Sequence, residues 1–247
     1  MRFSKSGLKA VICAAVALGL GTPVSAVWAQ DSEELTVPGP NYRIPSLYRV
    51  DEDGVEAFLI VGQGAWGDTI ATLAALREIG PERDAAIIEQ LWRERDTNPP
   101  LFLFEVARRA VATQPDLALE AYMLGRVRTI YDASRCLDST AIDVVDVATQ
   151  YAGEAVIDVM AERLSTVPAM LEGFLSNGDA FASQASPWWA CSFSDSVYLA
   201  AVNGAPMTGP EWLKVEAVWP SIQADVSENV QANATLVRAA VENGAAQ

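Results

Sequence analysis

The chain has 247 residues, of which 51% are hydrophobic, and it carries 17 basic and 32 acidic side chains for a formal net charge of −15. This apolar content suffices for a packed core, so the composition is not that of a disordered protein. The chain has no histidine, which excludes Ser-His-Asp and Cys-His catalysis, histidine-ligated zinc or iron, and histidine pH sensing within it.

Residues 1–29 are predicted to be a secretory signal peptide. Basic residues without any acid occupy the start, an apolar run extends from Ala10 to Gly21, and small residues lead to Ala29. An uncleaved membrane anchor is the alternative, but this run is well short of the ~20 residues that span a bilayer. We therefore expect cleavage near Ala29 and a periplasmic or secreted protein whose mature chain has no transmembrane segment.

The mature chain is predicted to be strongly acidic. Without residues 1–29 it carries 14 basic and 32 acidic side chains, a net charge of −18, and residues 136–247 hold 3 of the basic and 14 of the acidic ones. Such a surface repels nucleic acid and anionic lipid headgroups and favours cationic partners. High solubility is the simpler consequence of the same charge.

Residues 30–54 are polar and proline-rich, and we expect an extended N-terminal arm before a single helical domain over residues 55–247. That domain starts with the one strand candidate, Val55–Val61, an apolar run bounded by glycines. From Asp68 the hydrophobic period becomes helical, with breaks at Gly80-Pro81 and Asn98-Pro99-Pro100. Helices are predicted over residues 68–79 and 82–95, from Leu101, and from Pro115 to about Ile130.

Three pairs of opposite charges four residues apart occur in these helices: Glu89–Arg93, Glu105–Arg109 and Arg128–Asp132. Such pairs are typical of solvated helix faces, where each contributes only a few tenths of a kcal/mol. The arginines are therefore interpreted as surface residues and not as an anion-binding site.

The second half of the chain is also predicted to be helical. A helix over residues 140–151 is followed by a break at Gly153 and by helices over 155–164 and 168–175. Between Gly178 and Gly209 the periodicity is poor, and we expect a long, partly ordered region. Helical structure resumes over 210–218, and a long amphipathic helix with an apolar stripe follows Pro220.

The predicted fold is mainly α, built from antiparallel helical hairpins. The two hairpins over residues 82–135 resemble the helix-pair units of tetratricopeptide or Sel1-type repeats. No fixed period or repeated motif follows them, so the sequence predicts no repeat array.

Cys136 and Cys191 are the only cysteines after the predicted signal peptide. In an oxidising compartment we expect them to form one disulfide that closes a loop of about 55 residues. A redox-active pair is usually closely spaced, as in C-x-x-C, so the bond is predicted to be structural.

The segment Gly62–Gly67 spells G-x-G-x-x-G between the strand candidate and a helix. In a dinucleotide site these glycines bring backbone N–H groups to a pyrophosphate at the helix N-terminus. No second strand and no ribose-binding acid follow here, however, because Gly80-Pro81 leads into another helix. We therefore interpret the motif as a glycine-rich strand-to-helix connection and predict no cofactor.

Trp188 and Trp189 stand just before Cys191, and adjacent tryptophans do not easily both point into one core. An exposed tryptophan stacks on sugar rings or anchors protein interfaces, whereas burial over the disulfide is the alternative. The predicted disulfide brings this pair near the side chains of Arg135, Asp138 and Asp195. These five residues form the candidate binding site.

Carboxylates are the one catalytic group in good supply, and a glycosidase needs two of them about 5–10 Å apart. Asp138 and Asp195 flank the two cysteines and are the candidate pair for such an enzyme. No spacing selects them from the other acids, and no calcium-loop spacing or other metal site is present. The preferred function is a non-catalytic interaction or accessory protein with a protein partner, and the alternative is a carboxylate-dependent glycan hydrolase of the cell envelope.

Overall fold

The computed structural model describes residues 72–203 and 210–245, and over these residues the protein is mainly α-helical, as the sequence predicts. The predicted signal peptide, the N-terminal arm, the strand candidate Val55–Val61 and the glycine motif at 62–67 lie outside the described residues. A helix at residues 72–77 comes first and is followed by α3 (Asp84–Arg93), α4 (Leu101–Ala110), α5 (Pro115–Ser134), α6 (Val144–Ala152), α7 (Glu154–Glu162), α8 (Val167–Ser176), α9 (Trp188–Cys191), α10 (Asp195–Val202) and α11 (Trp219–Ala245).

Short 3₁₀ turns join several of these helices. They are η1 (Pro81–Arg83), η2 (Ser139–Asp143), η3 (Leu164–Thr166), η4 (Asp179–Phe181), η5 (Pro210–Trp212) and η6 (Glu216–Val218).

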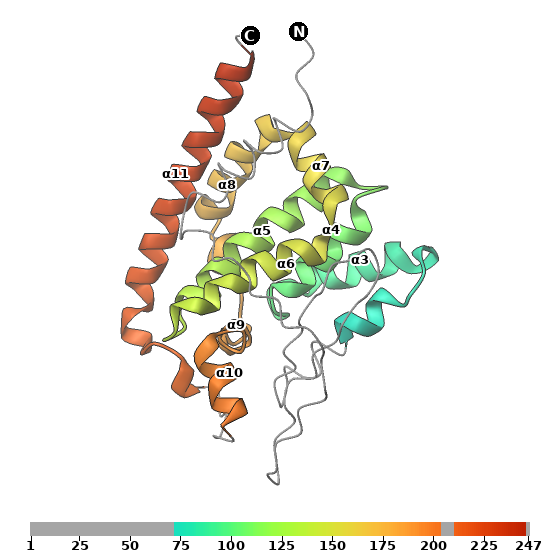
Figure 1. Ribbon diagram of the computed structural model, residues 1–247. Coiled ribbons are helices and arrows are strands. Elements are labelled where there is room, and N and C mark those ends of the chain that lie inside the picture. Colours follow the sequence, from blue (N-terminus) through green and yellow to red (C-terminus); the bar gives the residue numbers. More distant parts are fainter. Residues whose placement is uncertain (1–71, 204–209, 246–247) are drawn as a thin grey trace, which may run out of the picture.

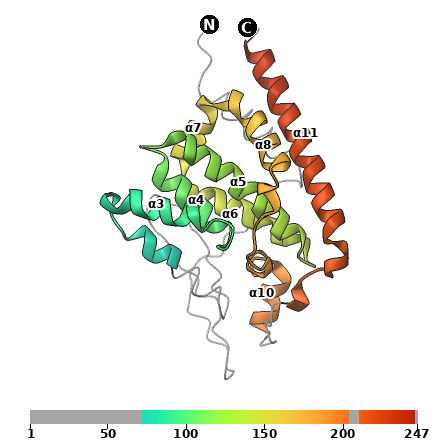
Figure 2. The ribbon, with the colours of Figure 1, turned by 180° about the vertical axis from the view of Figure 1, so that it is seen from behind.

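Helix α5 is the central element of the fold (Figures 1 and 2). It begins at Pro115, whose fixed φ and missing N–H suit the first helical turn, as the sequence predicts. Helices α4, α6, α7, α8, α9 and α11 all pack against it. Buried residues therefore occur on every side of α5, which is typical of a helix enclosed by its neighbours.

Helices α4 and α5 form a closely packed antiparallel hairpin. Gly125 of α5 lies where a Cβ atom would come within 3.2 Å of Leu103 Cβ and 3.0 Å of a ring carbon of Phe104. Such distances are too short for ordinary packing, so glycine at this position permits the close approach of the two helices.

The break predicted at Gly153 separates α6 from α7. Its φ of +84° is a conformation that L side chains rarely adopt, and nothing lies within 4 Å of an added Cβ. The backbone conformation and not the available space therefore requires glycine here.

Helix α11 runs along one edge of the molecule beside α8 (Figure 1). Its predicted apolar stripe is buried at Ile222, Val226, Val230 and Val237. Of the region over residues 178–209, the structure describes residues 178–203, and these differ from the prediction because they contain η4, α9 and α10. These elements are short, so tertiary contacts stabilise them and hydrophobic periodicity does not reveal them.

Candidate functional site

The Cys136–Cys191 disulfide lies at the C-terminal end of α5, with a Cα–Cα distance of 5.3 Å. It joins α5 to α9, and both cysteines are buried. Backbone hydrogen bonds of 2.8 Å from Leu137 N to Trp212 O and from Lys214 N to Arg135 O hold the 210–219 segment against the same place. The predicted disulfide is thus confirmed, and three segments distant in sequence meet around it.

Asp132 is the buried acid at this junction. Trp189 Nε1 donates to its Oδ2 atom at 2.5 Å, and Arg135 donates to its Oδ1 atom. Burial raises the pKa of Asp132 to about 6, although the attraction of Arg135 and the hydrogen bonds from Trp189 and Arg135 partly oppose that rise. This carboxyl links α5 to α9 and is inaccessible to a substrate.

Arg135 is buried between two aromatic rings. Its guanidinium carbon lies 4.1 Å from the centroid of the Tyr131 ring and 4.7 Å from that of Trp219, the first residue of α11. Cation–π attraction is strong for a desolvated guanidinium. Arg135 therefore fastens the beginning of α11 to the end of α5.

Asp138 caps η2 and accepts hydrogen bonds both from its own turn and from the start of α10. They come from Thr140 N and Oγ1 at 2.9 and 2.8 Å and from Ser196 N and Oγ at 2.8 and 2.5 Å. Burial of Asp138 alone raises its pKa, but these donors outweigh that effect and lower the pKa to about 2. The ionised carboxylate thus holds the start of α10 on η2, while the neighbouring Asp195 is exposed.

The two adjacent tryptophans have different surroundings. Trp189 is buried against Asp132, whereas Trp188 is half-buried and stacks on Trp212 with ring centroids 6.3 Å apart and an interplanar angle of 19°. Trp212 belongs to η5, so this pair of rings connects α9 to the 210–219 segment. Both tryptophans are part of the packing around the disulfide.

The structure therefore gathers the predicted site residues around one junction but directs most of them inward. Arg135 and Trp189 meet at Asp132, and Asp138 is joined to α10. Sequence reasoning did not select Asp132, because its spacing from Arg128 is that of a surface pair. The available signal was Arg135, which follows Asp132 by one helical turn.

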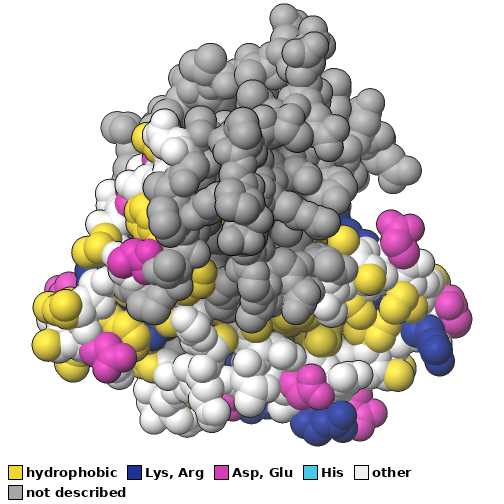
Figure 3. All heavy atoms as spheres, turned by 90° about the horizontal axis from the view of Figure 1, so that it is seen from below, with side chains coloured by type: hydrophobic (Ala, Val, Ile, Leu, Met, Phe, Trp, Pro, Cys, Tyr) yellow, Lys and Arg dark blue, Asp and Glu magenta, His cyan; other side chains and the backbone are white. Residues whose placement is uncertain are grey.

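An exposed apolar surface borders this junction. Four of the large hydrophobic side chains that are exposed in the described part of the chain lie here, with exposed fractions of 59% for Leu137, 56% for Leu199, 69% for Val215 and 39% for Val218. Seen from below, hydrophobic and acidic side chains appear on both sides of the molecule, and α10 and the start of α11 lie on the left (Figure 3). We call Leu137, Leu199, Val215 and Val218 the disulfide-end face.

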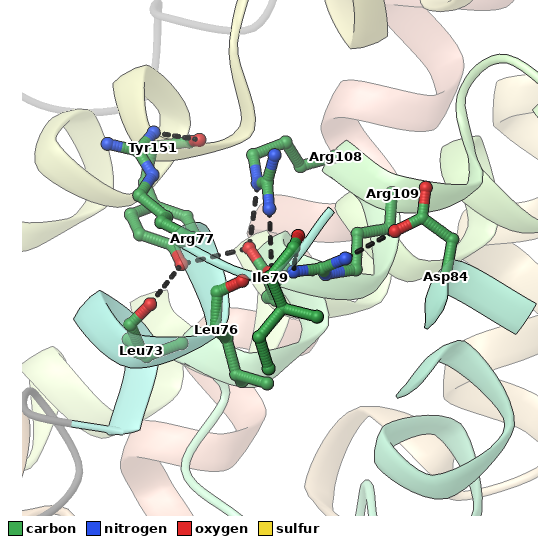
Figure 4. A network of polar contacts seen from close by, with 9 residues as sticks. Leu73, Leu76, Arg77, Ile79, Asp84, Arg108, Arg109 and Tyr151 are labelled. Atoms are coloured by element: carbon green, nitrogen blue, oxygen red, sulfur yellow. Dashed lines mark hydrogen bonds and ion pairs between the residues drawn. The ribbon is translucent and has the colours of Figure 1, made fainter. Parts of the chain in front are cut away.

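A second buried polar cluster lies on α4, and Figure 4 shows its members Arg108, Arg109 and Tyr151. The predicted surface pair Glu105–Arg109 is buried here. Glu105 accepts hydrogen bonds from Arg108 at 2.8 Å, from Arg109 at 2.6 Å and from the Tyr151 hydroxyl at 2.9 Å. Burial raises the pKa of Glu105, but these donors, with the charge of Arg108, reverse the shift and leave the pKa below its usual value.

Arg109 extends this cluster to the first described helix. It donates to the carbonyl oxygens of Leu76 and Ile79 and pairs with Asp84 of α3. The interpretation of Glu105–Arg109 as a solvated pair is therefore wrong, because that face of α4 meets other helices. Only the pair Glu89–Arg93 is exposed as predicted, with an N–O distance of 3.8 Å.

Arg128 is the third buried charge, and its predicted surface pairing with Asp132 is also wrong. Its guanidinium donates to Asp179 O at 2.9 and 2.8 Å, to Arg95 O at 2.7 Å and to Asp96 Oδ1 at 2.6 Å. Arg128 thus fastens two connecting segments to α5. In the clusters around Glu105 and Arg128, the charged groups form hydrogen bonds and ion pairs with other parts of the same chain.

No protein-family model, curated protein or solved structure matches the chain. Among the described helices, none has the length and apolar character required to cross a membrane. Within residues 72–203 and 210–245, no group of three or more cysteine and acidic side chains is arranged to hold a metal ion.

Proposed function

We propose that the protein is an exported, non-catalytic interaction protein that binds a protein partner through its disulfide-end face. The observation that carries this proposal is the contrast between the exposed apolar side chains there and the inward-directed polar groups beside them. Adjacent exposed apolar side chains are typical of interaction surfaces, whereas a catalytic site requires polar groups that reach the substrate.

The alternative, a glycan hydrolase acting through Asp138 and Asp195, has less support. A general acid in such an enzyme needs a carboxyl with a raised pKa. Hydrogen bonds from Ser196 and Thr140 instead outweigh the effect of burial and hold the pKa of Asp138 at about 2. Its four acceptor contacts also leave it engaged with the chain itself.

The test uses the mature chain, residues 30–247, immobilised and exposed to an envelope extract of its source. We expect a protein to be retained at stoichiometric amounts and to bind the purified chain again in isolation. Glycan cleavage by the purified chain that is lost in Asp195→Asn would overturn the proposal in favour of the hydrolase. Asp195 suits this test because it is exposed, so its substitution disturbs the fold little.

A further inference from the structure

We infer that the disulfide-end face docks a protein segment that presents basic side chains around apolar ones, a basic amphipathic helix for example. This inference rests on the proposed function and specifies the chemistry of the partner. Its evidence is the placement of the apolar residues, the sign of the charge around them, and the rigidity of the structure beneath.

Hydrogen bonds join the segments that carry the apolar residues. The hydrogen bonds between residues 135–137 and 212–214 place Leu137 beside the strand-like segment that leads to Val215. The bonds from Ser196 to Asp138 hold α10, which carries Leu199, against the residue that follows Leu137. The four side chains thus come from three segments that these hydrogen bonds join at the disulfide end of α5.

Among the residues that the structure describes, the exposed charges next to these side chains are acidic. On α10, Asp195 lies four residues before Leu199 and therefore on the same helix face. Asp143 lies near both Asp146 and Asp195. Partial burial raises the pKa of Asp143, and the negative charges of these two neighbours raise it further. Glu216, between Val215 and Val218, is exposed as well.

The basic side chains of this region do not balance these acids at the surface. Arg135 is buried against Asp132, and Lys214 Nζ donates to Ser134 O at 2.9 Å. The remaining basic residues after position 135 are Arg163 and Arg238, which pair with Asp116 and Glu172. The face is therefore apolar with an acidic border, and basic side chains complement that border.

The same charge argues against other occupants. A second copy in a two-fold arrangement would bring the acidic border against itself, which costs free energy. Nucleic acid and anionic lipid carry the same sign of charge and are repelled. Because the disulfide and the Arg135 stack support the face, a segment that docks there meets a largely pre-formed surface, and the ordering cost is small.

The experiment measures fluorescence anisotropy of labelled synthetic peptides with the full mature chain. The first peptide has leucines on one helix face and lysines on the other; a second has glutamate in place of lysine, and a third has serine in place of leucine. We expect the leucine–lysine peptide to bind at least about tenfold more tightly than either of the others. Equal binding of the lysine and glutamate peptides would overturn the inference.

Matched variants locate the site. Leu137→Ser is expected to weaken binding of the leucine–lysine peptide about fivefold to tenfold, because it removes most of one apolar contact. Leu236→Ser is the control: Leu236 is 48% exposed on α11, about 25 Å along that helix from Trp219, and its substitution should leave affinity within about twofold. Equal losses in the two variants would overturn the inference.

Charge and stability provide two further measurements. Asp195→Asn should weaken binding severalfold at low salt and less at high salt, whereas Glu242→Gln near the end of α11 should not. Leu137→Ser should leave the thermal midpoint unchanged, because Leu137 is exposed. If the wild-type protein does not bind the peptide and Leu137→Ser lowers the thermal midpoint, another part of the chain covers this face. If the protein is a dimer that Leu137→Ser dissociates, a second copy covers it. Either result overturns the inference.

The two proposals fail separately. If the chain retains no protein partner from the extract, the proposed function falls. It also falls if the retained partner binds Leu137→Ser and Leu236→Ser equally well. If Leu137→Ser loses the partner but the lysine and glutamate peptides bind the wild type equally well, only the inference of a basic partner falls.

Discussion

Replacement of Arg128 by methionine tests whether a buried guanidinium stabilises this fold. Arg128 is completely buried and donates to two backbone carbonyls, those of Asp179 and Arg95, and to the carboxylate of Asp96. Methionine fills similar space with an apolar chain and donates nothing. Arg128→Met therefore leaves both carbonyls without their donor.

The expected loss follows from these contacts. Each carbonyl deprived of its donor costs about 1–2 kcal/mol. The side chain of Asp96 is 40% exposed, so water replaces its lost partner, and that ion pair contributes at most about 1 kcal/mol. Removal of a buried cation regains part of its desolvation cost. We expect a net loss of about 3 kcal/mol in the free energy of unfolding.

Urea denaturation followed by circular dichroism measures this loss. With a slope of about 2 kcal/mol per molar urea, the midpoint should fall by about 1.5 M. Arg93→Met is the matched control, because Arg93 is 66% exposed and its pair with Glu89 contributes little, so we expect a change below about 0.5 kcal/mol. If Arg128→Met changes stability no more than Arg93→Met, the buried guanidinium does not stabilise the fold and the reasoning is refuted.

Three further predictions concern Asp132, the disulfide and the helix glycines. Because burial raises the folded-state pKa of Asp132 to about 6, above its usual value of 3.8, the folded chain binds this proton more tightly than the unfolded chain. The stability of the wild type relative to Asp132→Asn should therefore increase as the pH falls from 7 to 4, by up to about 3 kcal/mol, and urea midpoints that differ equally at both pH values would contradict this. Replacement of Cys136 and Cys191 by serine should cost about 4 kcal/mol, the chain-entropy value for the closed loop; two titratable thiols in the wild-type protein would show that the bond does not form. Gly125→Ala should lower the thermal midpoint, because its Cβ would meet a ring carbon of α4 at 3.0 Å, whereas Gly173→Ala, with nothing within 4 Å, should stabilise α8 by up to about 1 kcal/mol; equal shifts would argue against close packing at the first position.

Much of the fold could be predicted from local chemistry. Pro115 sets the start of α5 through its fixed φ, and Gly153 ends α6 through a positive φ that other residues avoid. The 3.6-residue period reveals the buried stripe of α11. Cys136 and Cys191 have only each other as partners after the predicted signal peptide, so their bond follows from counting and from the compartment.

The short helices α9 and α10 could not be predicted in this way. Four residues in α9 and eight in α10 are too few for hydrophobic periodicity to identify a helix. Their stability comes from contacts with distant residues, such as Trp189 with Asp132 and Ser196 with Asp138. Such contacts exist only after the chain has folded.

The candidate site divides in the same way. The sequence by itself determined the helical class, the disulfide and the neighbourhood of Trp188, Arg135 and Asp138 around it. The tertiary structure decided that Asp132 is buried at that junction and that Leu137 remains exposed beside it. A four-residue spacing states only that two side chains share one face of a helix. Whether that face meets water or another helix depends on how the helices pack, and this packing turns predicted surface charges into buried ones.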